Sequence, residues 1–349
     1  MSPFEASRSR AAPANDGRED PVATVVVPAH DAAQVLGDCL SALEDQSIPR
    51  AEFEVIVVDD GSGDGTGEVA EGFADVRVLR QPQRGPAAAR TRGARAARAP
   101  IVVFTDADCE PTEDWLAALL EPFDDPSVVG SKGTYLTRQR SLTARFTQLE
   151  YESKYDRMRR FSSIDFVDTY AAAFRRSAFL EAGGYDEGFP VPSAEDVDLS
   201  FRLAAAGHRM LFSPEATVYH RHPERLRTYL SRKYRYAHWR VKAVATTPRK
   251  ILSDSHSPPA DKAQAALMVP LAALLALRAV WPPAGRMLLG VLAVHGVLGA
   301  PFVVKALRRD PRVAAAAPLL LVARSAYQAA GLVTGTVRQL LSEPAAASD

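Results

Sequence analysis

The sequence predicts a mostly parallel α/β sheet domain followed by a C-terminal helical region. Short β-branched runs alternate with segments of helical apolar spacing through the first third of the chain, which is typical of a doubly wound sheet. From about residue 262 the composition changes to long alanine, leucine and valine runs. At 349 residues the chain is long enough for one large α/β domain plus an appendage.

The elements expected in the sheet domain follow in alternation. Val22–Pro28 and Phe53–Val58 are β-branched runs suited to strands buried on both faces. Between them, helical spacing over Ala33–Gln46 completes a βαβ unit. Further expected strands are Val76–Leu79, Ile101–Thr105, Val128–Leu136 and Phe166–Phe174, and further expected helices are Pro86–Ala99, Arg176–Ala182 and Glu195–Ala206.

Composition narrows the class of function. Lysine and arginine (42) balance aspartate and glutamate (42), so no overall charge favours nucleic acid as a partner. Cys39 and Cys109 form neither a disulfide framework nor a repeated metal spacing, which fits a reducing cytosolic compartment. Residues 1–20 are polar without an apolar core, so we expect a disordered segment and no cleaved signal peptide.

The most informative motif places two carboxylates, Asp106 and Asp108, at the end of an apolar strand. Open α/β sheets bind ligands beyond the carboxyl ends of their strands. Two carboxylates one residue apart can hold a hard divalent cation, which neutralises a bound diphosphate. The competing interpretation is that these aspartates cap the next helix.

A second acidic pair, Asp59 and Asp60, ends the second strand and precedes a glycine-rich loop. Such carboxylates can accept hydrogen bonds from a nucleoside base or ribose. A dinucleotide-binding dehydrogenase is disfavoured, because its glycine turn must follow the first strand. A P-loop enzyme is disfavoured as well, since GxxxxGK[ST] does not occur.

A third acidic group, Glu195, Asp196 and Asp198, opens an amphipathic helix. The helix macrodipole favours acidic residues in a first turn, so capping is one explanation. Three carboxylates exceed what a cap requires. A carboxylate beside an acceptor hydroxyl could remove its proton as a general base.

Taken in order, these motifs resemble family 2 glycosyltransferases. The segments that carry the resemblance are PAHD, VVDDGSGDGT, GPAAARTRGARAA, FTDAD, GGYDE and AEDVDLSFRLAAAGHRM, over roughly residues 22–240. The resemblance is to the branch with C-terminal membrane helices. It implies a GT-A nucleotide-sugar-binding fold and an inverting transfer from a UDP-, GDP- or dTDP-sugar to a glycan or lipid-linked acceptor.

The resemblance also implies roles for individual residues. The implied nucleotide-sugar-binding residues are Pro28, His30, Asp59, Asp60, Arg90 and Asp106. Asp106 and Asp108 match the DxD motif that binds Mn²⁺ or Mg²⁺, with Asp108 as the more direct ligand. Glu195 and Asp196 match the acidic catalytic motif, with Asp196 as the general base.

Two histidines, His220 and His222, are candidates to complete the metal shell or to contact the diphosphate, with ordinary surface histidines as the alternative. The chain departs from processive polymerases of the family, whose QxxRW signature is replaced by Arg235–Trp239. The basic, aromatic segment around it is typical of a membrane interface. A solvated helix face is the competing interpretation.

Three apolar stretches, Ala263–Trp281, Met287–Val304 and Val313–Val333, each approach the roughly 20 residues that cross a bilayer. Arg278, His295 and Arg324 interrupt them, so a soluble helical appendage is the alternative. Lysine and arginine residues between the second and third stretches favour a cytoplasmic catalytic domain on the inner membrane. Three spans would then place the C-terminal tail outside.

These expectations divide the chain into five parts. They are a disordered segment (1–20), a GT-A domain (21–240), an interfacial linker (241–262), about three membrane helices (263–335) and a tail (336–349). Two rival functions stay open. A sugar nucleotidyltransferase shares the metal carboxylates but needs a glycine- and lysine-rich loop after the first strand, and an inactive membrane scaffold would keep the fold without turnover.

Overall fold

The structure is a computed structural model that describes residues 20–189, 193–245, 247 and 254–342. The expected disordered segment falls outside the described residues except for Asp20. The strands are β1 (Ala23–Ala29), β2 (Phe53–Asp59), β3 (Val76–Arg80), β4 (Ile101–Phe104), β5 (Cys109–Pro111), β6 (Val128–Leu136), β7 (Ala172–Arg175) and β8 (Arg209–His220). The helices of the sheet domain are α1 (Leu36–Glu44), α2 (Thr66–Glu71), α3 (Pro86–Ala96), α4 (Trp115–Leu120), α5 (Leu142–Met158), α6 (Arg176–Glu181) and α7 (Glu195–Ala205), and the helices that follow are α8 (Leu226–Ala245), α9 (Pro259–Leu277), α10 (Pro283–Arg309) and α11 (Pro311–Ser342).

The strands form one mixed sheet in the order β3-β2-β1-β4-β7-β6-β8-β5. The first four strands in this order run parallel, as the alternating pattern predicts. Strand β7 is antiparallel to both β4 and β6, and β5 is antiparallel to β8. Because β1, β2 and β4 are parallel, their carboxyl ends meet at one edge of the sheet, and the acidic motifs that follow them lie there.

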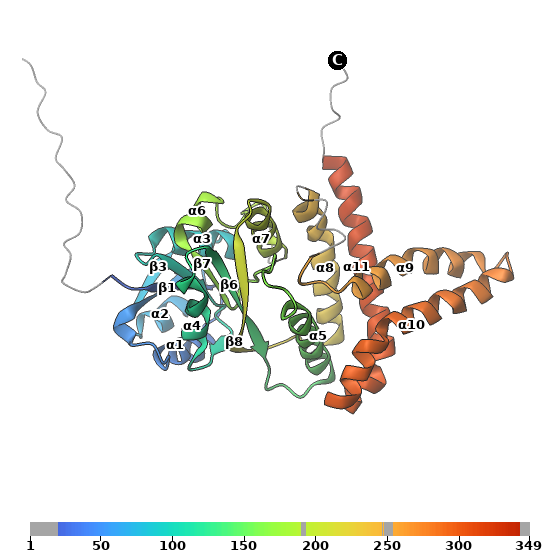
Figure 1. The fold of residues 1–349 in the computed structure, drawn as a ribbon, viewed down its shortest axis with the longest axis horizontal. Coiled ribbons are helices and arrows are strands. Elements are labelled where there is room, and N and C mark those ends of the chain that lie inside the picture. The colour runs from blue at the N-terminus through green and yellow to red at the C-terminus, as the bar shows by residue number, and fades with distance from the viewer. Residues whose placement is uncertain (1–19, 190–192, 246, 248–253, 343–349) are drawn as a thin grey trace, which may run out of the picture.

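Helices cover both faces of the sheet (Figure 1). Along β1, Val25 and Val27 belong to the core beneath α1 and α4, whereas Val26 belongs to the core beneath α3 and α7. All three side chains are fully buried. This double burial explains why the strand is a continuous run of apolar residues and does not alternate with polar ones.

The strand expected over Phe166–Phe174 begins only at Ala172, so the predicted start is wrong. The backbone N–H of Val167 donates to the hydroxyl of Ser200, at 2.9 Å, in place of a neighbouring strand. Phe166 and Val167 are nevertheless buried. Burial without strand pairing produced the apolar pattern that the sequence shares with a true strand.

The three apolar stretches expected near the C-terminus correspond to α9, α10 and α11, which are long and apolar enough to cross a membrane. A separate apolar core joins α10 and α11 to the sheet domain. Phe146 of α5 and Tyr229 of α8 pack there against Val313 and Leu321 of α11. Figure 1 shows α9 and α10 extending away from the sheet domain, while α11 runs beside α8.

The contact between α3 and β1 leaves no space for a larger residue at Gly93. A Cβ on Gly93 would lie 2.3 Å from Cγ1 of Val26. We therefore expect Gly93→Ala to lower the free energy of unfolding by about 1–3 kcal/mol through overpacking. Denaturant unfolding of the full chain measures this loss.

Gly37→Ala is the matched control, because Gly37 also lies in a helix and a Cβ there meets nothing within 4 Å. It should leave stability unchanged or raise it by up to about 1 kcal/mol. Equal behaviour of the two variants would contradict the close packing of α3 on β1.

Candidate active site

The acids at the end of β2 bind two loops, Asp60 the loop before α3 and Asp59 the loop before α2. The carboxylate of Asp60 accepts hydrogen bonds from the backbone N–H groups of Arg84, at 2.8 Å, and Gly85, at 2.7 Å. Gly85 has a φ of 90°, which favours glycine. Asp59 accepts from the backbone N–H of Ser62 at 3.0 Å. Both carboxylates thus fix loops at the sheet edge.

The remaining residues of the implied nucleoside pocket lie at the same edge. Pro28 is paired with Val58 at the end of β1. His30 follows β1, and its Nε2 lies 2.9 Å from Nε2 of Gln83 in the loop before α3. Since Asp60 holds this same loop, the structure brings Pro28, His30, Asp59 and Asp60 to one region.

A buried guanidinium joins two of the acidic motifs. Arg90 on α3 is 4% exposed. Its Nη2 lies 2.6 Å from Oδ1 of Asp106, after β4, and its Nη1 lies 3.6 Å from Oε1 of Glu195, at the start of α7. Within the described part of the chain, Nε and Nη1 make no hydrogen bond. A buried cation with donors to spare is suited to binding an anion such as a diphosphate.

Asp108 lies beside His220, because β5 and β8 pair directly after Asp108. Strand β8 pairs His220 with Cys109, and Nε2 of His220 lies 3.7 Å from Oδ2 of Asp108. One ligand atom from each of Asp108, Cys109 and His220 falls within a 4.8 Å cluster. Burial raises the pKa of the Cys109 thiol well above its usual range, so this sulfur stays protonated. The oxygen and nitrogen donors fit a hard or borderline divalent cation such as Mn²⁺ or Mg²⁺.

The second histidine is directed elsewhere. Nε2 of His222 lies 3.0 Å from Oε1 of Gln148 on α5, and its ring stacks on Tyr151. Burial, followed by the charge of the neighbouring His220, lowers the pKa of His222 to about 3. The geometry therefore favours His220 over His222 as a metal ligand.

The pKa of Asp196, at the start of α7, is raised well above its ordinary value. Burial is the main cause, followed by the charges of Glu195 and Asp168, while Arg90 acts in the opposite direction. Its neighbour Asp198 forms an ion pair with Arg202 at 2.8 Å. A carboxylate with a raised pKa is a stronger base than an ordinary aspartate.

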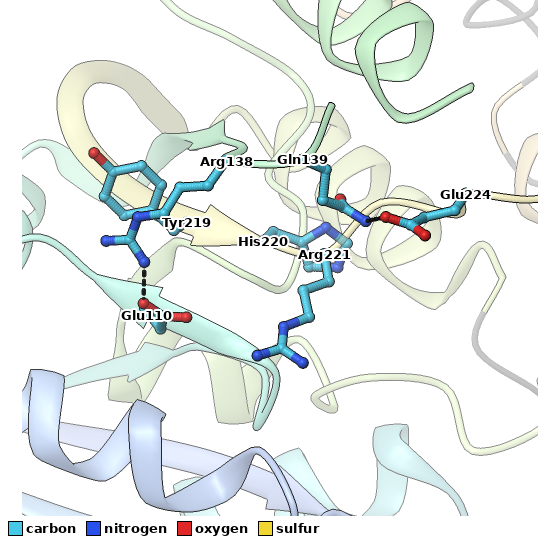
Figure 2. Close-up of a pocket in the computed structure, with 7 residues that line it drawn as sticks. All are labelled: Glu110, Arg138, Gln139, Tyr219, His220, Arg221 and Glu224. Carbon is cyan, nitrogen blue, oxygen red and sulfur yellow. Dashed lines mark hydrogen bonds and ion pairs between the residues drawn. The ribbon is translucent and has the colours of Figure 1, made fainter. Parts of the chain in front are cut away.

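A pocket of about 420 Å³ adjoins the candidate metal residues (Figure 2). It shares His220 with them, and the guanidinium of Arg138 stacks on the ring of Tyr219 while contacting Glu110. The other lining residues are Gln139, Arg221 and Glu224. Sequence analysis missed this pocket, because it depends on the pairing of β5 with β8 across more than a hundred residues.

A buried ion pair near Asp196 was also missed. Lys132 on β6 is fully buried, and its ammonium contacts the carboxylate of Asp168 and, at 2.9 Å, the hydroxyl of Tyr170. The available signal was a lysine within the apolar strand Val128–Leu136. Such a lysine requires a buried partner.

Part of the chain matches a known protein family. Residues 24–183 match the family model described as Glycosyl transferase family 2. The pre-mycofactocin glycosyltransferase of Mycobacterium tuberculosis is 35% identical over 224 residues, which cover 61% of this chain and 45% of that protein. The validoxylamine A glucosyltransferase of Streptomyces hygroscopicus is 30% identical over 229 residues, which cover 56% of this chain and 54% of that protein. The chain thus spans about half the length of these relatives.

Among solved structures, a mannosyltransferase from Pyrobaculum calidifontis in complex with GDP-Man and Mn²⁺ resembles the whole chain. The TM-score is 0.57 at 24% identity, over 93% of this chain and 89% of that chain. This likeness confirms the predicted GT-A fold class. The family match confirms the resemblance that the ordered acidic motifs indicate.

Loss of the bridging cation should destabilise the site. We expect Arg90→Met to lower the free energy of unfolding by about 3–5 kcal/mol, because Asp106 and Glu195 would lose their buried partner. Denaturant unfolding of the full chain measures the loss. Arg92→Met, on the exposed side of the same helix, should stay within about 0.5 kcal/mol of the parent protein. A loss below about 1 kcal/mol for Arg90→Met would show that the bridge does not hold the site together.

Proposed function

Because residues 24–183 match the model of glycosyl transferase family 2, we propose that the chain is an inverting glycosyltransferase that uses a nucleotide-sugar donor. The observation that carries the proposal is the bridge through Arg90, which joins the acid after β4 to the acid at the start of α7. Asp106 belongs to the proposed metal motif and Glu195 is the neighbour of the proposed base, Asp196, so the bridge supports placing metal and base at one site. The acceptor is a glycan or a lipid-linked sugar held at a membrane.

In the proposed reaction, the acceptor hydroxyl oxygen attacks the anomeric carbon of the donor sugar. The bond from this carbon to the diphosphate oxygen breaks, and the nucleoside diphosphate leaves. Asp196 takes the hydroxyl proton. One displacement inverts the configuration at the anomeric carbon, so a covalent sugar–enzyme intermediate is not needed.

The chain's own residues position the donor. The spare donors of Arg90 bind the diphosphate oxygens, and Pro28, His30, Asp59 and Asp60 surround the nucleoside. Asp106, Asp108 and His220 would hold Mn²⁺ or Mg²⁺, which supplies positive charge to the diphosphate leaving group. The oxygen and nitrogen donors gathered at Asp108 and His220 support this assignment.

The proposed location is the inner membrane, with residues 21–240 as a cytoplasmic catalytic domain and 263–335 as the membrane region joined to it by 241–262. Basic residues gather at the turn between α10 and α11, and Lys305 there pairs with Asp156 of α5 at 2.8 Å. A basic turn against the catalytic domain agrees with the positive-inside rule.

Metal dependence is tested by thermal unfolding with UDP, GDP or dTDP, each with and without Mn²⁺. A ligand that binds only the folded state raises the apparent melting temperature. Asp108→Asn should abolish the Mn²⁺-dependent part of the nucleotide shift. Asp114→Asn, an exposed acid a few residues later, should keep it. A full Mn²⁺-dependent shift in Asp108→Asn would remove Asp108 from the metal site.

The role of Asp196 is tested by nucleoside diphosphate release from a donor panel at varied pH. Asp196→Asn should lower kcat by about 10²–10⁴-fold while keeping the Mn²⁺-dependent nucleotide shift. The base must be ionised and its pKa is raised. As the pH is lowered, kcat/KM of the parent protein should therefore begin to fall at a pH well above the ordinary aspartate pKa of about 3.9.

Asp198→Asn is the matched control, because its carboxylate is paired with Arg202 and not with the site. It should keep most of the parent turnover. Full activity of Asp196→Asn would exclude it as the base. Release of no nucleoside diphosphate from any donor by the parent chain would favour an inactive scaffold.

A further inference from the structure

The third apolar helix, α11, contacts the catalytic domain along its whole length. Just before its start, Asp310 pairs with Arg145 of α5 at 3.2 Å. In its middle, Arg324 pairs with Glu150 of α5 at 2.9 Å. Near its end, the guanidinium of Arg338 lies 4.0 Å from the ring centre of Trp239 on α8. A helix that leaves the domain to cross a bilayer would keep such contacts at one end only.

Two glycines allow α11 to approach the backbone of α8. A Cβ on Gly331 would lie 2.3 Å from the carbonyl oxygen of Tyr234, and a Cβ on Gly335 would lie 2.3 Å from that of His238. Their four-residue spacing places both on one face of α11. This face is therefore occupied by α8 and is not available to another membrane helix.

Helix α8 cannot accompany α11 into a bilayer. Its basic residues are Arg227, Arg232, Lys233, Arg235, Arg240 and Lys242. Each would be costly in hydrocarbon. Arg324 of α11 is itself buried, and with Lys233 it lowers the pKa of Glu150 to about 2, against the effect of burial, which raises it. The middle of α11 therefore lies at the level of the charged surface of the catalytic domain.

The hairpin of α9 and α10 is arranged differently from α11. Its two ends are tied by ion pairs, Asp261 of α9 to Arg324 of α11 at 3.0 Å and Lys305 of α10 to Asp156 of α5 at 2.8 Å. At its far turn, Val280 is 81% exposed and Trp281 is 43% exposed. Gln264 of α9 still contacts Arg324 of α11 at 2.7 Å. From there to the exposed turn at Trp281 the hairpin extends about 25 Å at about 1.5 Å per residue, most of a hydrocarbon core of about 30 Å.

We propose that the α9–α10 hairpin crosses the membrane, whereas α11 lies on the membrane surface beside α8. This inference rests on the membrane attachment proposed above. The apolar side of α11 that faces away from α8 then rests in the boundary between lipid headgroups and acyl chains. Its exposed residues there include Leu319, Val333, Val337, Leu340 and Leu341. Two spans, not three, leave the C-terminal tail on the same side as the catalytic domain.

The test is labelling with a membrane-impermeant maleimide in sealed vesicles of both orientations. Three variants of the full chain carry a single new cysteine, at exposed Glu113, at Val280, or after Asp349. The native Cys39 and Cys109 are fully buried, so the parent chain gives the unlabelled background. Each variant is first checked for release of nucleoside diphosphate at the rate of the parent chain, which shows that the variant is folded.

We expect the cysteine after Asp349 to be labelled in the same vesicles as Glu113→Cys. Neither cysteine should be labelled in vesicles of the opposite orientation. Val280→Cys should show the reverse pattern. If the cysteine after Asp349 is labelled in the same vesicles as Val280→Cys, the proposal is overturned in favour of three spans. Labelling of all three in one orientation would overturn the crossing of the hairpin. A chain that does not sediment with membranes would instead refute the membrane attachment itself.

Discussion

The buried guanidinium of Arg90 is the interaction on which the site depends. Asp106 follows β4 and Glu195 begins α7, so nothing local in the sequence holds these two acids together. Like charges in a poorly solvated site repel each other. Arg90 comes from α3, and both its contacts with these acids are made from a side chain that is almost fully buried. One cation from a third element thus fixes the separation of the other two.

The parts of the site that sequence could predict are those set by parallel strands. Asp60 and Asp106 follow strands whose carboxyl ends meet at one edge, so their approach follows from the alternating pattern. The approach of His220 to Asp108 does not, because it needs β8 to pair with the short strand β5. No local pattern encodes that pairing. The choice between His220 and His222 therefore required the structure.

Buried polar groups explain the other differences. The apolar run from Phe166 reads as a strand, but its backbone bonds to Ser200, and Asp168 is turned inward to Lys132. Sequence periodicity reports burial and does not report the partner that causes it. The same holds for α8, whose basic, aromatic composition left an interface and a solvated face as equal alternatives. Helix α11, which packs on α8, lies roughly a hundred residues later in the chain.

The shared core of α5, α8 and α11 has a consequence for the independence of the sheet domain. Phe146, Leu149, Tyr229 and Leu230 are buried in one apolar cluster with residues of α10 and α11. A chain cut just before α9 would expose this apolar surface and leave Glu150 without Arg324. Such a fragment would be prone to aggregate, since large exposed apolar patches promote association. The sheet domain and the C-terminal helices therefore constitute a single cooperative folding unit.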